Sequence, residues 1–336
     1  MEFLSEIGLF GLKALVIVIS IIVVLLFGVM LAAKNKLLGK LEVKDLNDQY
    51  QGYSNLLKQI AFSKDELKKD EKSQKKKDKK SKKAIPSKIY YIKFEGDIKA
   101  SSVEQLREEV TTILSVASKK DEVVVNIESP GGMVHTYGLA AAQLERIKKA
   151  EIPLTVCVDK VAASGGYLMA CTANKILAAP FAIVGSIGVI AQVPNFNKLL
   201  KKNNIDYEEI TSGEYKRTVS LFGEITEKGK QKFTEDIVET HKLFRDFVNK
   251  HRPHLDINQV ATGEHWYGQQ AIDKKLIDEI ATSDEYLYSK INDFRIISVK
   301  VKEKQGLQKK LSEAMSLVVK KGISGYLKEV ETDYKF

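Results

Sequence analysis

A run of twenty residues without a charged side chain, from Ala14 to Ala33, constrains this chain more than any other feature of its sequence. At a rise of about 1.5 Å per residue, a helix of that length spans the roughly 30 Å hydrocarbon core of a bilayer. A cleaved signal peptide has a shorter apolar region and a basic start, whereas Glu2 and Glu6 precede this run. The sequence therefore predicts an uncleaved transmembrane helix at 14–33, after a short N-terminal segment at 1–13.

Residues 34–86 are predicted to form a juxtamembrane helix, within 41–62, and a lysine-rich linker. Eleven lysines lie between Lys64 and Lys83, so much of the formal charge of +9 is concentrated there. Like charges repel and bury nothing, which is typical of a linker or a solvated helix extension. No aromatic residue is interleaved with these lysines. Nucleic acid is therefore not an expected partner, and anionic lipid headgroups of a bilayer are favoured instead.

After Pro86 short apolar runs alternate with amphipathic stretches, which is typical of βαβ units and predicts an α/β domain at 87–300. A basic tail at 301–336 follows it. Cys157 and Cys171 stand in apolar surroundings and are expected in the core, without a disulfide framework. Strands are expected at Ile89–Phe94, Glu122–Ile127, Leu154–Val158, Ile176–Ala179, Ile187–Ala191 and Asp206–Ile210, and helices at Ser102–Ser118, Val134–Ala150, Ser164–Ala173, Thr226–Lys250 and His265–Lys275.

Two glycine-rich turns follow predicted strands, Glu128-Ser-Pro-Gly-Gly132 and Ala163-Ser-Gly-Gly166. Turns at the carboxyl ends of parallel strands are where α/β folds place ligand sites. Glycine lets backbone N–H groups approach a substrate carbonyl without a Cβ in the way. Such N–H groups form an oxyanion hole, in which a single donor is worth roughly 2.7–4 kcal/mol. The alternative is that both are simply tight strand-to-helix turns.

Ser164 is the candidate nucleophile because it stands at the head of a predicted helix, beside these amides. Its alternative role is a helix N-cap, for which serine is among the preferred residues. Capping alone would not require the two glycines that follow.

A serine hydroxyl is a weak nucleophile until a base removes its proton. No histidine has a distinctive setting, although a Ser-His-Asp triad stays open; the candidates are His135, His241, His251, His254 and His265. Lysine is the other possible base, because burial disfavours its charged form and lowers its pKa from about 10.4 by several units. Serine/lysine pairs are an established variant of this chemistry. Lys216 is a candidate because it lies in a compact turn, Thr211-Ser-Gly-Glu-Tyr-Lys-Arg217.

Four ordered motifs resemble the signal peptide peptidase A family of serine peptidases. They are Glu128-Ser-Pro-Gly-Gly132, Ala162-Ala-Ser-Gly-Gly-Tyr167, Gly185-Ser-Ile-Gly-Val189 and Ser212-Gly-Glu-Tyr-Lys216. The run Gly263-Glu-His-Trp-Tyr-Gly-Gln-Gln270 and the N-terminal anchor match one branch of that family. The resemblance covers about residues 1 to 290 well and the C-terminal tail poorly. It implies a ClpP/crotonase-like spiral superhelix of ββα units.

The resemblance also implies roles for individual residues. Ser164 corresponds to the nucleophile and Lys216 to the general base, while Ser186 is expected to orient the lysine amine. Gly132 and Gly165 match the oxyanion-hole donors, and Gly131 supports the turn. In relatives the site is assembled between protomers, so a ring-shaped homo-oligomer is implied, in which Ser164 and Lys216 come from different subunits or from the same one. Neither a cofactor nor a metal is implied.

Two neighbours of Lys216 bear on its use as a base, since it must lose its proton near neutral pH. Arg217 adds a like charge that would favour the neutral amine if it were close; alternatively it is a surface residue in an ion pair. Glu214 would favour the charged amine, and alternation in an extended stretch points it the same way as Lys216. The sequence does not resolve this conflict.

Three classes of function compete. The first is a membrane-anchored serine endopeptidase that acts on unfolded, hydrophobic or membrane-derived peptides. The second is acyl-CoA chemistry of the crotonase type, which needs no serine nucleophile, so the Ser164 and Lys216 pair argues against it. The third is a catalytically inactive relative that acts as a membrane assembly partner.

The expected location is the bacterial inner membrane, with a single span. Which side of the membrane the catalytic domain occupies stays open. Lysines directly after the span favour a cytoplasmic domain, whereas the family resemblance favours the periplasmic side.

Overall fold

The computed structural model of the chain describes Ser20, residues 41–70 and residues 87–302. The chain divides into two units, Val43–Lys300 and a second one made of Met1–Glu42 with Val301–Phe336. The predicted membrane helix at 14–33, apart from Ser20, and the predicted tail, apart from Val301 and Lys302, lie outside the described residues. Within the described ranges, no helix is both long enough and apolar enough to cross a membrane.

Seven strands form the main sheet, in the order β1-β10-β2-β3-β4-β6-β9. Their bounds are Leu41–Asp45 (β1), Lys88–Glu95 (β2), Glu122–Glu128 (β3), Leu154–Val158 (β4), Lys175–Ala178 (β6), Glu279–Ile280 (β9) and Arg295–Val301 (β10). Every pair from β10 to β9 is parallel. The near-continuous apolar runs of β3 and β4 are typical of parallel strands covered on both faces, and all five residues of β4 are buried. The predicted α/β class is confirmed.

A smaller, three-stranded sheet lies beside the carboxyl end of β3. It consists of β5 (Val161–Ala163), β7 (Ile183–Gly185) and β8 (His265–Tyr267); β5 and β7 are parallel, and β8 is antiparallel to β7. A single bridge between Ser129 and Ala162 joins the end of β3 to β5. This bridge brings the two glycine-rich turns of the sequence together.

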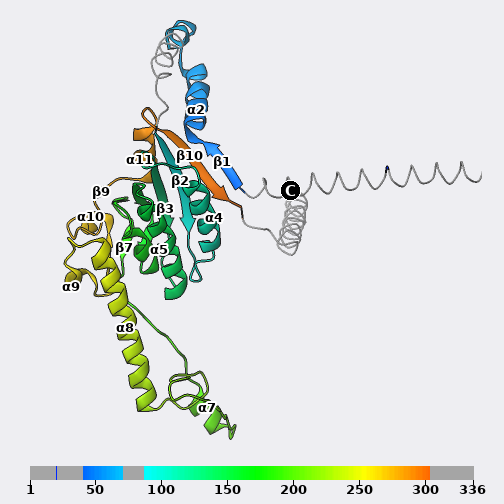
Figure 1. Ribbon diagram of the computed structural model, residues 1–336, viewed down its shortest axis with the longest axis vertical. Helices are drawn as coiled ribbons and strands as arrows, with labels where there is room; N and C mark the ends of the chain where they lie inside the picture. The colour runs from blue at the N-terminus through cyan, green and yellow to red at the C-terminus, as the bar shows by residue number, and fades with distance from the viewer. Residues whose placement is uncertain (1–19, 21–40, 71–86, 303–336) are drawn as a thin grey trace, which may run out of the picture. The chain divides into compact units, whose positions relative to one another are not determined.

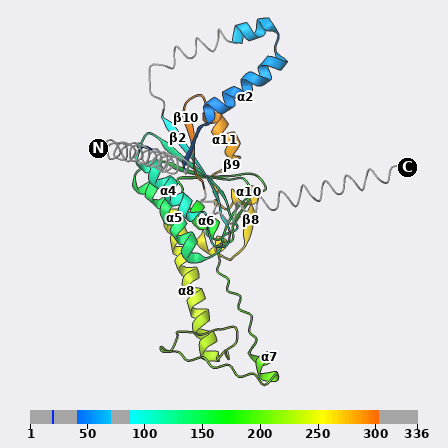
Figure 2. The same ribbon diagram turned by 90° about the vertical axis from the view of Figure 1, so that its right-hand side faces the viewer.

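Three helices lie side by side against the main sheet (Figures 1 and 2): α4 (Val103–Leu114), α5 (Val134–Lys149) and α6 (Gly165–Ala170). The buried face of α5 includes Tyr137, Ala140, Leu144 and Ile147, whose spacing follows the helical period. The other described helices with printed bounds are α2 (Leu46–Ala61), α7 (Asn197–Lys202), α8 (Glu227–His251), α9 (Ile257–Val260), α10 (Gly268–Ala271) and α11 (Ser283–Lys290).

The long helix α8 is attached to the domain mainly through its C-terminal part. Its first turn is capped by the Thr226 hydroxyl, which accepts a hydrogen bond from the Gly229 amide. Only Gly229 and Val248 are buried along its 25 residues. Just beyond its end, buried Arg252 forms a two-point ion pair with Asp278, at 2.7 and 2.8 Å. The rest of α8 extends away from the sheet toward the segment that contains α7 (Figures 1 and 2).

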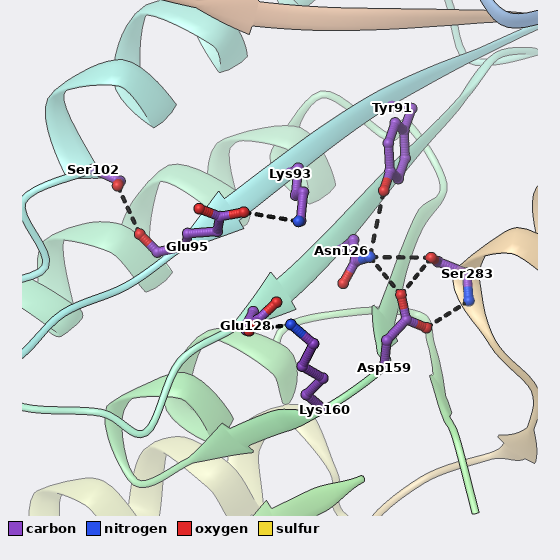
Figure 3. Close-up of polar contacts among 9 residues, drawn as sticks. All are labelled: Tyr91, Lys93, Glu95, Ser102, Asn126, Glu128, Asp159, Lys160 and Ser283. Atoms are coloured by element: carbon purple, nitrogen blue, oxygen red, sulfur yellow. Dashed lines mark hydrogen bonds and ion pairs between the residues drawn. The ribbon is translucent and has the colours of Figure 1, made fainter. Parts of the chain in front are cut away.

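A partly buried polar network joins the start of α11 to the main sheet (Figure 3). The Asn126 amide on β3 donates to the Asp159 carboxylate at 2.6 Å, and the backbone N–H and hydroxyl of Ser283 donate to the same carboxylate. The Asn126 amide also lies 3.3 Å from the Tyr91 hydroxyl oxygen. Buried polar groups that are fully paired fix the geometry of a core, so this network positions α11.

Three of the expected elements are wrong. The strand placed at Ile187–Ala191 lies instead at β7, because Gly185 and Ser186 adopt positive φ angles, 94° and 53°, that end it. The segment Asp206–Ile210 is exposed and forms no ladder with any described strand. The helix expected at His265–Lys275 begins with β8, whose Trp266 is buried against β7, and only α10 is helical there.

Candidate active site

The two glycine-rich turns are held together by backbone hydrogen bonds. The Ser129 N–H donates to the Val161 carbonyl at 2.8 Å, and the Ala163 N–H donates to the Ser129 carbonyl at 3.0 Å. Gly131 then lies directly against the second turn: a Cβ at this position would come within 2.7 Å of the Ser164 Cβ and 2.6 Å of the Gly165 nitrogen. Because φ at Gly131 is also +90°, the turn requires glycine there.

Ser164 stands between β5 and α6 in a strained conformation, with φ of 50° and ψ of −117°. Its N–H donates to the Gly185 carbonyl at 2.8 Å, and its side chain is half-buried. It makes no side-chain cap for α6, so the alternative role as an N-cap is not what holds it there. A non-glycine residue at such a φ costs about 1–3 kcal/mol, and positions of this kind cluster at functional sites.

Gly132 and Gly165 present backbone N–H groups beside Ser164. Within the described part of the chain, neither N–H makes a hydrogen bond. Side chains have no room at either residue: a Cβ would lie 2.1 Å from the Ile98 carbonyl oxygen at Gly132 and 2.3 Å from the Tyr137 ring at Gly165. Tyr137 is fully buried and donates to the Asp97 carbonyl at 2.6 Å. Burial raises the pKa of Tyr137, so the ring that supports Gly165 stays uncharged.

A cavity of about 240 Å³ opens beside Ser164. Gly132, Ser164 and Gly165 line it, together with mostly apolar residues from α5, α6, α8 and the segment after β7. The wall residues are Val134, Tyr137, Gly138, Ala141, Leu168, Gly188, Val189, Ile190, Thr240, Leu243, Phe244 and Phe247. The arrangement places Ser164 in the lining of a mostly apolar pocket, together with two glycines whose N–H groups bind no described residue.

Ser186 directly follows Gly185, whose carbonyl accepts a hydrogen bond from the Ser164 N–H. The backbones of the two serines are therefore close together. The Ser186 N–H donates to the Glu264 carbonyl at 2.7 Å, and its side chain is half-buried. Its hydroxyl makes no hydrogen bond to any described residue. Ser186 therefore has an available hydroxyl within the same group of turns.

Lys216 is not brought to Ser164 within one chain. It lies in an exposed turn, where its N–H donates to the Gly213 carbonyl at 3.2 Å, and it does not line the cavity. The neighbouring Glu214 pairs with Lys228 at the start of α8. Thr240, the nearest cavity residue on α8, stands twelve residues further along, about 18 Å at the rise of an α-helix.

The two neighbours of Lys216 have other partners. The hydrogen bond and charge of Lys228 hold the pKa of Glu214 below its usual value, so this carboxylate is engaged with Lys228. Arg217 lies 3.7 Å from Glu209 in an exposed ion pair. The interpretation of Arg217 as a surface residue in an ion pair is therefore the one that applies in the single chain.

The five candidate histidines lie apart from the cavity lining. All five lie in the described ranges, and none lines the cavity beside Ser164. His251 contacts Glu145 at 3.0 Å at the C-terminal end of α8, and burial lowers its pKa. The other four are His135, His241, His254 and His265.

The wall that α8 contributes was not anticipated from the sequence. Leu243, Phe244 and Phe247 form an apolar stripe on a helix whose remaining residues are mostly polar. Spacing of three and four residues is the signal that predicts such a face. Only the fold shows that this face lies beside the Ser164 turn, because that turn is about eighty residues away in the sequence.

Comparison with known proteins identifies the family. The family "Peptidase family S49" matches residues 146–293, and "Peptidase family S49 N-terminal" matches residues 2–144. A probable protease SohB from Haemophilus influenzae is 48% identical over 324 residues, which is 92% of each chain. A second one, from Buchnera aphidicola subsp. Acyrthosiphon pisum, is 46% identical over 285 residues, 84% of this chain and 85% of that one.

A solved structure, that of a membrane-bound stomatin-specific protease in complex with a substrate peptide, aligns with a TM-score of 0.42 at 13% identity, covering 69% of this chain and 99% of that one. A TM-score this low does not establish a common fold. The chain belongs to peptidase family S49, the signal peptide peptidase A family, and within that family to the SohB branch.

Proposed function

We propose that this chain is a membrane-anchored serine endopeptidase with Ser164 as nucleophile and Lys216 as general base. The observation that carries the proposal is the cavity that Ser164 lines together with Gly132 and Gly165, two glycines whose N–H groups make no hydrogen bond to a described residue. Donors fixed in advance at the point where negative charge develops are the largest single source of catalysis in acyl transfer. The strained backbone of Ser164 supports the same reading.

The proposed reaction has two steps. The Ser164 oxygen attacks the peptide carbonyl carbon while its proton passes to the neutral Lys216 amine, and the N–H groups of Gly132 and Gly165 bind the resulting oxyanion. The C–N bond then breaks as the lysine ammonium protonates the leaving amine. Water hydrolyses the acyl-enzyme; the lysine takes a proton from that water and returns it to the Ser164 oxygen. Ser186 is proposed to orient the lysine amine by a hydrogen bond.

A second copy of the chain is proposed to supply Lys216. A lysine gives up its proton near neutral pH only in a desolvated site, yet in one chain Lys216 is exposed and its turn is attached to the far end of α8. The segment around it also exposes large apolar side chains, including Ile210 at 93% and Tyr215 at 48%. Such exposed apolar groups mark an interaction surface. A homo-oligomer would cover them and desolvate Lys216.

The remaining parts of the proposal rest on the sequence. Residues 14–33 are proposed to anchor the chain in the bacterial inner membrane, with residues 34–86 linking the anchor to the catalytic domain. The fold is proposed to be the ClpP/crotonase-like superhelix. The substrates are proposed to be unfolded or membrane-derived peptides, in keeping with the apolar walls of the cavity.

Covalent labelling tests the proposal. A fluorophosphonate probe should label the purified full-length chain, and the Ser164→Ala variant should not be labelled. Lys216→Ala should be labelled at least about 100-fold more slowly, because the hydroxyl then lacks its base. Thr211→Ala, in the same exposed segment, is a matched control that should be labelled like wild type. Absence of labelling in an oligomeric wild-type preparation would contradict the assignment of Ser164.

A further inference from the structure

Gly138 occupies an unusual position for a glycine, in the interior of helix α5. It lies one turn after Val134 and one turn before Ala141, so these three residues form one stripe of the helix. All three line the cavity beside Ser164. Glycine lowers the stability of a helix interior relative to alanine, so the position calls for a reason.

The fold itself gives no reason for glycine at position 138. A Cβ there would meet no heavy atom within 4 Å, and φ is not positive, unlike that of Gly131. By contrast, added Cβ atoms at Gly132 and Gly165 would collide with backbone or with a fully buried ring. The fold therefore requires glycine at positions 132 and 165, whereas the space beside the Gly138 Cα is open.

That empty space is the cavity beside the nucleophile. Phe244 and Phe247 on α8 and Leu168 on α6 also line it. An apolar cavity of about 150 Å³ in another protein holds a benzene molecule, and this one measures about 240 Å³. It has room for a large apolar side chain as long as α5 contributes no side chain at position 138.

We propose that Gly138 sets the size of the pocket that receives a large apolar side chain, of leucine or phenylalanine size, from the residue whose carbonyl Ser164 attacks. This inference rests on the proposed peptidase function. Gly138, an exposed residue, leaves its part of the pocket wall without a side chain, while Phe244, Phe247 and Leu168 provide apolar contact. A side chain on Gly138 would fill the pocket from within and favour substrates with small side chains at that position.

Matched peptides test the proposal, differing only in phenylalanine or alanine before the scissile bond. The purified full-length oligomer should favour the phenylalanine peptide in kcat/KM. In Gly138→Ala this preference should fall about tenfold, and in Gly138→Leu it should fall at least 100-fold and invert, since even one methylene in an apolar pocket changes discrimination by about 10–200-fold.

Gly52 provides the matched control, because it also lies inside a helix, α2, and a Cβ there would meet nothing within 4 Å. Gly52→Leu should leave the preference between the two peptides unchanged. Both Gly138 variants should unfold thermally no earlier than wild type, because each replaces a helical glycine.

Three outcomes would overturn the proposal. One is an unchanged peptide preference in a Gly138→Leu protein that the fluorophosphonate still labels. The second is a loss of the oligomer in Gly138→Leu but not in Gly52→Leu, which would assign the space to a second copy. The third is a wild type that prefers the alanine peptide. Failure of the proposed function is distinct, because then Ser164 of the wild type would not be labelled at all.

Discussion

The turn that carries Ser164 and the segment that carries Lys216 differ in how much of their structure one chain provides. Around Ser164 the backbone is crowded, and hydrogen bonds to Ser129 and Gly185 fix both turns. Around Lys216, residues 205–217 are exposed throughout and contain no helix or strand. The nucleophile's half of the proposed site is thus rigid in isolation, whereas the base's half presents apolar residues such as Ile210 to solvent.

This difference matches the chemistry that each half has to perform. An oxyanion hole works because its donors are fixed before the reaction begins, and a single chain can fix them by folding. A lysine base works only where water is excluded, and the exposed segment of one chain does not exclude water. The contrast therefore favours a site in which the part around Ser164 forms when one chain folds, and the part around Lys216 forms when subunits assemble.

Complementation between inactive variants tests whether Ser164 and Lys216 of one site come from different subunits, and it has the largest expected effect. Ser164→Ala and Lys216→Ala should each lose at least about 1,000-fold in peptide hydrolysis, because nucleophile and base act as a unit. Co-assembled in equal amounts, the two variants should regain up to about a quarter of wild-type activity, since each site then pairs subunits at random. Peptide hydrolysis by the mixture, measured after dissociation and reassembly, checks this. Mixing without reassembly is the control, and no recovery on reassembly would place both residues in one subunit.

The second largest effect is expected from two glycines with positive φ, Gly131 beside Ser164 and Gly213 near Lys216. Gly131→Ala should destabilise the domain by about 3 kcal/mol and lower activity at least 100-fold, because its Cβ would collide with Gly165 and Ser164. Gly213→Ala should cost only about 1 kcal/mol, since φ is +99° but nothing lies within 4 Å of the added Cβ. Denaturant unfolding and peptide hydrolysis measure both effects. Equal losses of stability would contradict the contrast between a crowded turn and an open one.

Replacement of an exposed apolar residue near Lys216 tests whether that segment is an assembly surface. Ile210→Asp should weaken self-association about tenfold or more, because a charge would enter the apolar contact. Activity should then fall at low protein concentration and recover at high concentration, while the unfolding midpoint of the single chain is unchanged. Val116→Asp, at another exposed apolar position after α4, is the control. Sedimentation that is equally unaffected in both variants would exclude this segment from the interface.

The sequence predicted the main sheet better than the small one, for a physical reason. Parallel strands buried on both faces are dense apolar runs, so Leu154–Val158 was placed correctly. The strand expected at Ile187–Ala191 lies in an apolar stretch too, but its position is decided by the backbone angles of Gly185 and Ser186. Hydrophobic pattern does not report backbone angles, so β7 was misplaced.

The site shows the same limit. Both glycine-rich turns were predicted from local sequence, and the structure brings Gly132 and Gly165 to one cavity with Ser164. The wall from α8 and the open position at Gly138 depend on contacts between distant segments, which local patterns do not contain. The roles of Ser164 and Lys216 remain predictions that the experiments above decide, and the role of Ser186 is a prediction as well.

The smallest expected effect concerns the C-terminal part of α8, which ties the region of Lys216 to the domain. Burial, together with the charge of Lys148, lowers the pKa of His251 although Glu145 lies 3.0 Å away. The pKa of a histidine in an unfolded chain is about 6.5. Below that pH the unfolded state binds more protons than the folded state, so stability falls as pH decreases. Glu145 does not mask this window, because the net effect of its surroundings is to hold its pKa below 4.5. Denaturant unfolding should therefore show that wild type is less stable at pH 5.5 than at pH 7.5, and that His251→Gln loses less stability over the same range. The exposed His265→Gln variant is the control and should lose as much as wild type. An equal loss in all three proteins would show that His251 is not the residue that loosens this attachment.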